Sequence, residues 1–393
     1  MEERHRDAIN FLRLLLVIGL VFLHYGNFPG SVASPFDGFS GFHKEHALAT
    51  FVNIYFVYLF YSSVPLLGTI SGYLFFRNWK PGMDFYWKRI KSRTFSILLP
   101  MISWCAIVLA VFYVIRMFSP TSGFLALIDN YDLDNLGLRQ LVNALAGITR
   151  RPVNFQFWFL RDLFLTVLCT PLLGLLIRRI PYIGLAAIGL VWLFNVDVPV
   201  FFRNDVFFFF YLGGLIQARG WNLDFIPPRA AVVAMVVYLI VVGLRTVAPA
   251  FVTEDTAFGY VVLEPMTRLM RLLGVYAFWG CAPFLMRTFI GRQIVTWGAL
   301  AFFLHAIHWP LNHFVKDGLA ALLPPEGDAG LIMNYFGTTF VTIAISFAAA
   351  WLLNKTLPSL FSHLSGGREF NAPQHRNLSP AAVSSPQNSV ASP

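Results

Sequence analysis

The basic run from Lys88 to Arg93 carries the clearest chemical pattern in this sequence. Its two arginines, Arg89 and Arg93, stand at i and i+4, so on a helix they present two guanidinium forks on one face. Such forks suit the oxygens of phosphate groups. The run therefore indicates a polyanionic, nucleotide-like cofactor, although an anchor against anionic lipid would explain the same residues.

Arg13 and His24 lie in a hydrophobic segment, where an ionisable side chain is costly and so marks a functional hypothesis. Eleven residues separate them, which on a helix is about 20° past three whole turns and a rise of roughly 16 Å. We expect both on one helix face, with Arg13 near the cytoplasmic entrance and His24 near the outer surface. Alternatively, Arg13 snorkels to the interface and His24 caps the helix end.

Two further segments combine small or charged residues with apolar ones. Ser71 and Gly72 either let a ligand approach the backbone or form a small-residue helix contact, and the contact is favoured. Arg161 and Asp162 are adjacent, so on a helix they point about 100° apart and need not pair. They either hold a polar substrate or end a helix among interfacial aromatic residues.

His305, His308 and Asn312 share one face of a later segment, in which Pro310 frees a carbonyl group. Two histidines at i and i+3 can be metal ligands, but no carboxylate or third histidine stands at ligand spacing. A neutral polar network is therefore favoured, and no metal is expected.

Glu264, Arg268 and Arg271 also follow helical spacing, at i, i+4 and i+7. One helix face can therefore carry a Glu–Arg ion pair with a second arginine above it. We expect a structural pairing inside a helix bundle.

Membrane helices must position all these residues, because the composition excludes most soluble classes. The 393 residues are 57% hydrophobic and 12% charged, whereas a soluble domain is about 25% charged. Segments long enough for helical spans lie near 9–25, 51–76, 94–117, 156–177, 182–197, 205–218, 230–247, 261–286, 294–315 and 331–353. The expected fold is an all-α polytopic membrane helix bundle of about ten transmembrane helices.

The net charge of +9 follows from topology rather than from nucleic-acid binding. Ten spans place both termini on one side, which holds seventeen Lys and Arg. The opposite side has six: Lys44, Arg139, Arg150, Arg151, Arg203 and Lys316. This bias predicts that both termini are cytoplasmic. We expect an integral membrane domain over 1–360 and a disordered cytoplasmic tail over 361–393, to which we assign no chemistry.

Several of these segments form an ordered series that resembles the acyltransferase type 3 family of integral membrane proteins. The series covers residues 8 to about 355 and consists of Arg13 followed after ten residues by His24, Val64-Pro65, Ser71-Gly72-Tyr73-Leu74, Arg89 to Arg93 running into Leu99-Pro100, Phe157-Trp158-Phe159-Leu160, Tyr211-Leu212-Gly213-Gly214, and Phe303-Leu304 with His308-Trp309-Pro310. Arg161-Asp162 has no place in the family pattern, and His305 stands where the family usually has an apolar or aromatic residue.

The resemblance implies transfer of an acyl group, acetyl or succinyl, from an acyl-CoA in the cytoplasm to a hydroxyl of an exported or cell-envelope polysaccharide. The expected donor is acetyl-CoA, the acceptor a polysaccharide or lipid-linked oligosaccharide, and the location the bacterial inner membrane. His24 would be the general base, and Arg13, grouped with it as catalytic, would assist at the cofactor phosphates near the channel entrance. The remaining assignments are Ser71, Gly72, Arg89 and Arg93 for the cofactor, and Arg161, Asp162 and His308 for the substrate.

Two other function classes stay open. A transporter or flippase of a glycan or lipid-linked sugar would line its path with the intramembrane arginines and consume no acyl-CoA. A scaffold of a polysaccharide assembly complex would tolerate loss of these polar residues. Direct transfer and a covalent acyl relay are both compatible with the sequence.

Overall fold

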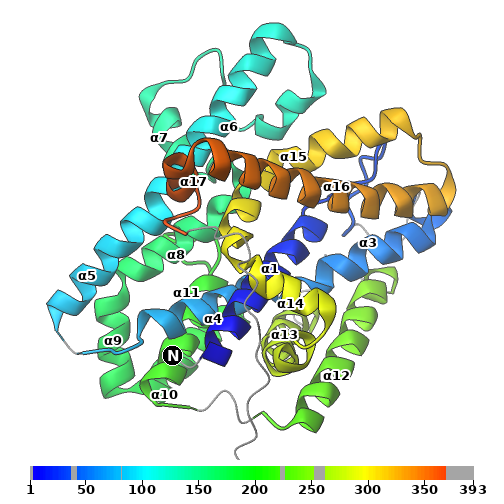
Figure 1. Cartoon of the computed structure of the whole chain (residues 1–393). Helices are drawn as coiled ribbons and strands as arrows, with labels where there is room; N and C mark the ends of the chain where they lie inside the picture. Colours follow the sequence, from blue (N-terminus) through cyan, green and yellow to red (C-terminus); the bar gives the residue numbers. More distant parts are fainter. Residues whose placement is uncertain (1–2, 37–41, 81, 222–225, 252–261, 369–393) are drawn as a thin grey trace, which may run out of the picture.

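The computed structural model describes residues 3–36, 42–80, 82–221, 226–251 and 262–368, and within them all regular structure is helical (Figure 1). This confirms the predicted all-α class. The first helices are α1 (Glu3–Leu23), α2 (Phe42–Glu45), α3 (Ala47–Leu59), α4 (Ser63–Phe75), α5 (Met83–Arg93), α6 (Leu99–Phe118), α7 (Leu138–Ala146), α8 (Trp158–Leu168) and α9 (Thr170–Arg179). They are followed by α10 (Pro181–Leu193), α11 (Asp205–Ala218), α12 (Pro228–Val247), α13 (Glu264–Leu285), α14 (Phe289–Thr296), α15 (Ala301–Leu322), α16 (Gly327–Thr356) and α17 (Pro358–Leu364).

Helix α1 runs through the middle of the bundle (Figure 1). It contacts α3, α4, α13, α14, α15 and α16. Leu12, Leu14, Leu16 and Val21 are fully buried. Helix α1, which carries Arg13 and ends one residue before His24, is therefore a core element that fixes both residues relative to the surrounding helices.

Helices α4 and α11 pack with their backbones in close contact. A Cβ atom on Gly72 would lie 2.0 Å from the carbonyl oxygen of Phe210, and one on Gly213 would lie 2.0 Å from that of Thr69. Small residues permit such an approach between apolar helices. The glycines of both sequence motifs thus serve helix packing.

Helix α15 is interrupted at Trp309, whose dihedral angles (φ −113°, ψ 132°) are not helical, directly before Pro310. Pro310 cannot donate a backbone hydrogen bond, which accounts for a break at this point. His305 and His308 lie before the break, whereas Asn312 and Lys316 lie after it.

Fewer helices qualify as membrane spans by length and composition than the ten spans predicted from the sequence. Among the described residues, four helices are long and apolar enough to cross a membrane: Ala47–Phe75, Met83–Phe118, Pro228–Ala250 and Gly327–Thr356. Two bent pairs, Phe155–Leu168 with Thr170–Arg179 and Glu264–Leu285 with Phe289–Thr296, raise this to six. Helices α10 and α11 have only 13 and 14 residues, against about 20 for a full span.

The predicted boundary at residue 360 falls inside α17, which continues to Leu364. Beyond it, the chain is described as far as Arg368. Most of the predicted disordered tail, residues 369–393, lies outside the described residues.

Candidate active site

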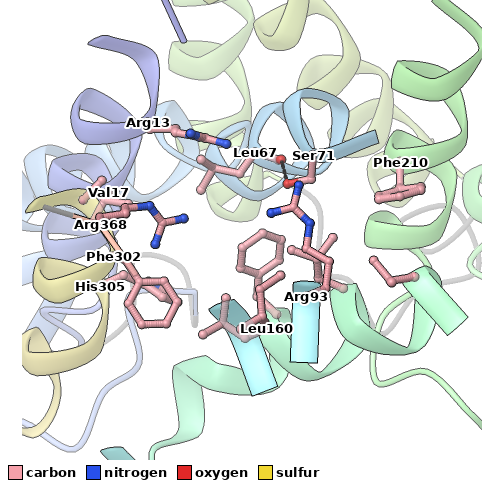
Figure 2. Close-up of a pocket in the computed structure, with 15 residues that line it drawn as sticks. Arg13, Val17, Leu67, Ser71, Arg93, Leu160, Phe210, Phe302, His305 and Arg368 are labelled. Atoms are coloured by element: carbon pink, nitrogen blue, oxygen red, sulfur yellow. Dashed lines mark hydrogen bonds between the residues drawn. The ribbon is translucent and has the colours of Figure 1, made fainter. Parts of the chain in front are cut away.

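Three arginines from distant parts of the chain meet at one narrow cavity of about 80 Å³. Arg13 comes from α1, Arg93 from the end of α5, and Arg368 from the segment after α17; their side chains extend into the same space (Figure 2). The rest of the lining is mainly apolar, and none of its described residues is acidic. Cations gathered in an apolar cavity without a carboxylate favour an anionic ligand.

Of the predicted pair Arg89 and Arg93, only Arg93 lines this cavity. Arg93 is the last residue of α5, and a π-helical turn, Thr94–Leu98, follows it before α6 begins. Such turns are frequent at functional sites. Arg89 instead donates to the carbonyl oxygen of Arg77 at 2.9 Å and stacks over Phe85, so it secures the connection between α4 and α5.

Ser71 lines the cavity and donates its hydroxyl to the carbonyl oxygen of Leu67 at 2.7 Å. Gly72, predicted as its companion at the cofactor, lies against α11 and does not line the cavity. The reason is geometric, because adjacent helical residues face about 100° apart. We assign Gly72 to helix packing.

Arg368 was not anticipated from the sequence, because the chain after Gly366 has no apolar periodicity. Its guanidinium lies over the ring of Phe302, 5.1 Å from the centroid, and donates to the carbonyl oxygen of Ser365 at 2.8 Å. Burial, and then the nearby Arg93, lower the pKa of Arg368 to about 10, so it stays a cation at neutral pH.

His305 connects this cavity to the histidine pair. It lines the cavity, is only 4% exposed, and neither ring nitrogen has a hydrogen-bond partner within the described chain. Its ring centroid lies 5.7 Å from that of His308. A buried polar ring without partners calls for an explanation, and a bound ligand would supply the missing partners.

His24 and His308 are joined by a hydrogen bond of 2.9 Å between Nδ1 of His24 and Nε2 of His308. Nδ1 of His308 lies 3.0 Å from the carbonyl oxygen of Leu304. A carbonyl oxygen only accepts, so Nδ1 of His308 carries the proton and Nε2 of the neutral ring accepts. Nδ1 of His24 therefore donates, which leaves Nε2 of neutral His24 unprotonated and basic.

Polar side chains of α15 and α16 hold the end of α1 in place. Lys316 donates to the carbonyl oxygens of Tyr25 at 3.3 Å and Asn27 at 2.9 Å. Asn312 donates to that of Val21 at 3.3 Å. The last carbonyls of a helix lack partners within it and favour a cation. These contacts differ from the neutral network predicted for His305, His308 and Asn312, because the break at Trp309 separates Asn312 from the two histidines and the cation Lys316 takes part. They fix the backbone on either side of His24.

Arg161 and Asp162 lie outside the arginine cavity, and their hydrogen bonds go mainly to backbone groups. They pair with each other at 2.8 Å. Arg161 also donates to the carbonyl oxygens of Gly147, Ile148 and Val200, while Asp162 accepts from the backbone of Phe202 and Arg203. Neither lines any of the described cavities, so their contacts indicate that they hold loops together.

A second cavity, of about 670 Å³, includes Tyr131, Arg150, Arg151, Phe155 and Trp309 in its lining. The ring of Phe155 is 5.1 Å from that of His24 and 5.2 Å from that of Trp309. The cavity is thus in contact with the histidine pair through Phe155. Its volume falls in the range of about 300–1,000 Å³ that is typical of small-molecule sites.

The loop that forms this cavity, between α6 and α8, is held by its own hydrogen bonds. Arg116 donates twice to Asp134 and through these bonds holds the pKa of Asp134 below its ordinary value. Burial raises the pKa of Tyr131 to about 12, so its hydroxyl keeps the proton that it donates to the Arg151 carbonyl oxygen.

The predicted Glu264–Arg268 ion pair is present at 2.9 Å. Arg271 instead pairs with Asp205 at 2.9 Å, and Trp192 donates to the same carboxylate. The sequence did not predict Asp205 as the partner of Arg271, because the two residues lie on different helices, 66 residues apart in the chain. In the part of the chain that the structure describes, no group of three or more His, Cys, Asp or Glu side chains could hold a metal ion.

Comparison with known proteins bears on what these cavities do. The model of the acyltransferase domain, Acyl_transf_3, matches residues 6–351. The chain belongs to the acyltransferase type 3 family. It is therefore an acyltransferase that transfers groups other than amino-acyl groups, and the apolar helices agree with a multi-pass membrane protein. The match includes Arg13, His24, Arg93 and His308 and ends before Arg368.

One curated relative of the chain carries the name succinoglycan biosynthesis protein ExoH, from Rhizobium meliloti (strain 1021). The two are 30% identical over 376 residues, which cover 94% of each chain. No solved structure matches the chain.

Proposed function

We propose that the protein transfers an acyl group, acetyl or succinyl, from acyl-CoA to a hydroxyl of an exported or cell-envelope polysaccharide. The observation that carries the proposal is that the His24–His308 pair contacts one residue of each cavity: His308 lies next to His305 of the arginine cavity, and His24 lies next to Phe155 of the larger cavity. Membership of the acyltransferase family and the name of the succinoglycan relative support it.

The arginine cavity is the donor site in this proposal. Arg13 and Arg93 bind phosphate oxygens of the coenzyme, and the narrow apolar remainder admits the uncharged pantetheine arm. Ser71 lies along that arm. Arg89, on the same helix as Arg93, contributes by fixing the start of α5.

The larger cavity is the acceptor site. Phe155 and Trp309 offer aromatic surface to the C–H face of a sugar, and Arg150 and Arg151 offer hydrogen-bond donors to its oxygens. His308 orients His24 rather than the sugar, and Arg161 with Asp162 supports the loops around the site. These roles replace the direct substrate contacts expected from the sequence.

Chemistry at the pair follows from the protonation of His24. Nε2 takes the proton of the sugar hydroxyl while its oxygen attacks the thioester carbonyl carbon. The carbon–sulfur bond then breaks, the new ester forms, and the proton passes from His24 to the departing coenzyme A thiolate. Direct transfer of this kind needs no acyl-enzyme intermediate.

The charge bias of the sequence supports placing the donor site on the cytoplasmic side and the acceptor site outside, with both termini cytoplasmic. We keep the ten-span topology as part of this proposal, with the short and bent helices completing spans in pairs. The membrane domain then extends over residues 1–360, in a bacterial inner membrane.

Purified protein in lipid vesicles tests the function directly, with acetyl-CoA or succinyl-CoA and a chemically deacylated exopolysaccharide. We expect acceptor-dependent release of free coenzyme A and a gain in glycan mass of one acetyl or succinyl group. His24→Ala should lower the rate by about 100-fold or more, as loss of a general base does. His46→Ala, outside both cavities, is the control. Glycan movement across the membrane without release of coenzyme A would instead identify a transporter.

A further inference from the structure

The segment from the end of α17 to Arg368 is tied to the bundle at several points. Nε1 of Trp104 donates to the carbonyl oxygen of Leu364 at 3.0 Å, and the hydroxyl of Ser103 lies 2.8 Å from Nε2 of His363. A Cβ atom on Gly366 would lie 2.4 Å from the carbonyl oxygen of Ser96. The segment therefore packs directly on α6 and on the π-helical turn after Arg93.

Two glycines turn the chain from α17 toward the arginine cavity. Gly366 and Gly367 have φ angles of +69° and +75°, a region that glycine enters at little cost and other residues rarely adopt. The turn brings Arg368 back over Phe302, where it lines the same cavity as Arg93 and Arg13. Figure 2 shows its guanidinium on the opposite side of the cavity from Arg93.

The charge of Arg368 has no counter-ion among the described residues. Its only hydrogen bond there goes to the Ser365 carbonyl oxygen, and no ion pair forms with it, with Arg13 or with Arg93. Like charges close together in an apolar cavity repel, and an anion placed between them removes that repulsion. Three separate guanidinium groups suit a ligand with several anionic oxygens.

We propose that Arg368 is a binding residue for the phosphate groups of the acyl donor, supplied by a C-terminal segment that lies outside the acyltransferase domain match. This inference rests on the proposed function for the identity of the donor. Arg368 forms part of the wall of the donor site, and the turn at Gly366 and Gly367 sets its position.

Binding of coenzyme A by the full chain in detergent or nanodiscs tests the inference. We expect Arg368→Ala to weaken binding about 10- to 100-fold, as loss of a hydrogen bond between charged groups does. The affinity of Arg368→Lys should lie between those of the wild type and Arg368→Ala, because lysine keeps the positive charge but loses the paired N–H donors of the guanidinium group. In turnover, KM for acyl-CoA should rise while kcat stays near the wild-type value. Arg292→Ala, which removes an exposed arginine outside the cavity, is the matched control.

Binding of pantetheine, which has no phosphate group, distinguishes contacts to the phosphate groups of coenzyme A from contacts to the rest of the molecule. Arg368→Ala should bind it like the wild type. An equal loss for pantetheine and coenzyme A, or coenzyme A binding equal to that of Arg292→Ala, would overturn the inference.

Inorganic diphosphate separates failure of the inference from failure of the proposed function. If the wild type bound no coenzyme A but gained thermal stability from diphosphate in an Arg368-dependent way, the anion site would stand and the donor assignment would fall. Absence of both effects would overturn both.

Discussion

In the proposed mechanism, His24 and His308 act as a pair without a carboxylate. In the serine-protease arrangement an aspartate orients the histidine and stabilises its charged form. Here a neutral imidazole does the orienting, and a backbone carbonyl oxygen fixes the tautomer of that imidazole. His308 can therefore direct the basic nitrogen of His24, but it adds no negative charge to the site.

Substitution of His308 separates orientation from substrate contact. We expect His308→Ala to lower kcat by about 10- to 100-fold, the range seen when a group that orients a functional histidine is lost, with KM for the glycan little changed. His308→Gln should recover part of the rate, because its amide oxygen can accept from Nδ1 of His24. Steady-state kinetics with a soluble acceptor oligosaccharide gives both constants.

The opposite pattern would restore the original assignment of His308. A large rise in KM for the glycan at unchanged kcat would mean that this ring contacts the sugar. The orienting role would then be wrong.

Among helices, the contact between α4 and α11 determines how two sequence motifs are used. Gly72 and Gly213 each face a backbone carbonyl oxygen of the other helix. The motif around Ser71 therefore has two faces, one that packs the bundle and one that lines the donor cavity. A substitution at Gly72 affects the cavity only by displacing α4.

Gly72→Ala should destabilise the protein. A Cβ atom 2.0 Å from a backbone oxygen forces the helices apart, and overpacking of this kind costs about 1–3 kcal/mol. Thermal unfolding in detergent measures the loss as a lower Tm. Gly82→Ala, where a Cβ atom would meet nothing within 4 Å, is the control. An unchanged Tm with weaker coenzyme A binding would show that Gly72 touches the donor.

Helical spacing allowed some of these roles to be predicted from the sequence and not others. Arg13 lies on the core helix α1, as its spacing predicted, whereas His24 lies in the turn directly after Leu23 and only Arg13 lines the cavity. A shared face for the two residues stays a prediction. The position of the Arg89 side chain depends on a hydrogen bond to a carbonyl oxygen twelve residues earlier in the chain. That of Arg161 depends on hydrogen bonds to three carbonyl oxygens in loops. Periodicity within one helix contains no information about such partners.

At the scale of the whole molecule, the site is assembled from both ends of the chain. Arg13 lies near the N-terminus and Arg368 near the end of the described residues, with Arg93, His305 and His308 between them. Charge distribution and the family motifs were sufficient to predict an all-helical membrane acyltransferase. They could not reveal Arg368, because its position depends on a tertiary contact made after the last hydrophobic segment.

Cysteine labelling tests whether the two cavities open on opposite sides of the membrane. In a variant without Cys105, Cys169 and Cys281, single cysteines replace the exposed residues Lys88, near Arg93, and Ala126, at the aromatic cavity. A maleimide that cannot cross membranes should label Ala126→Cys in intact spheroplasts, and Lys88→Cys only after permeabilisation. Labelling of both from one side would contradict the proposed two-sided arrangement.

The hydrogen bond from His308 to Leu304 also determines where a proton accepted by His24 can go. A proton accepted by His24 can move to His308, but it can go no further along this chain, because the next group is a carbonyl oxygen without a proton to pass on. The pair is thus a dead end for proton conduction. In the proposed mechanism, the proton that His24 accepts therefore leaves with the coenzyme A thiol and not along side chains behind His308.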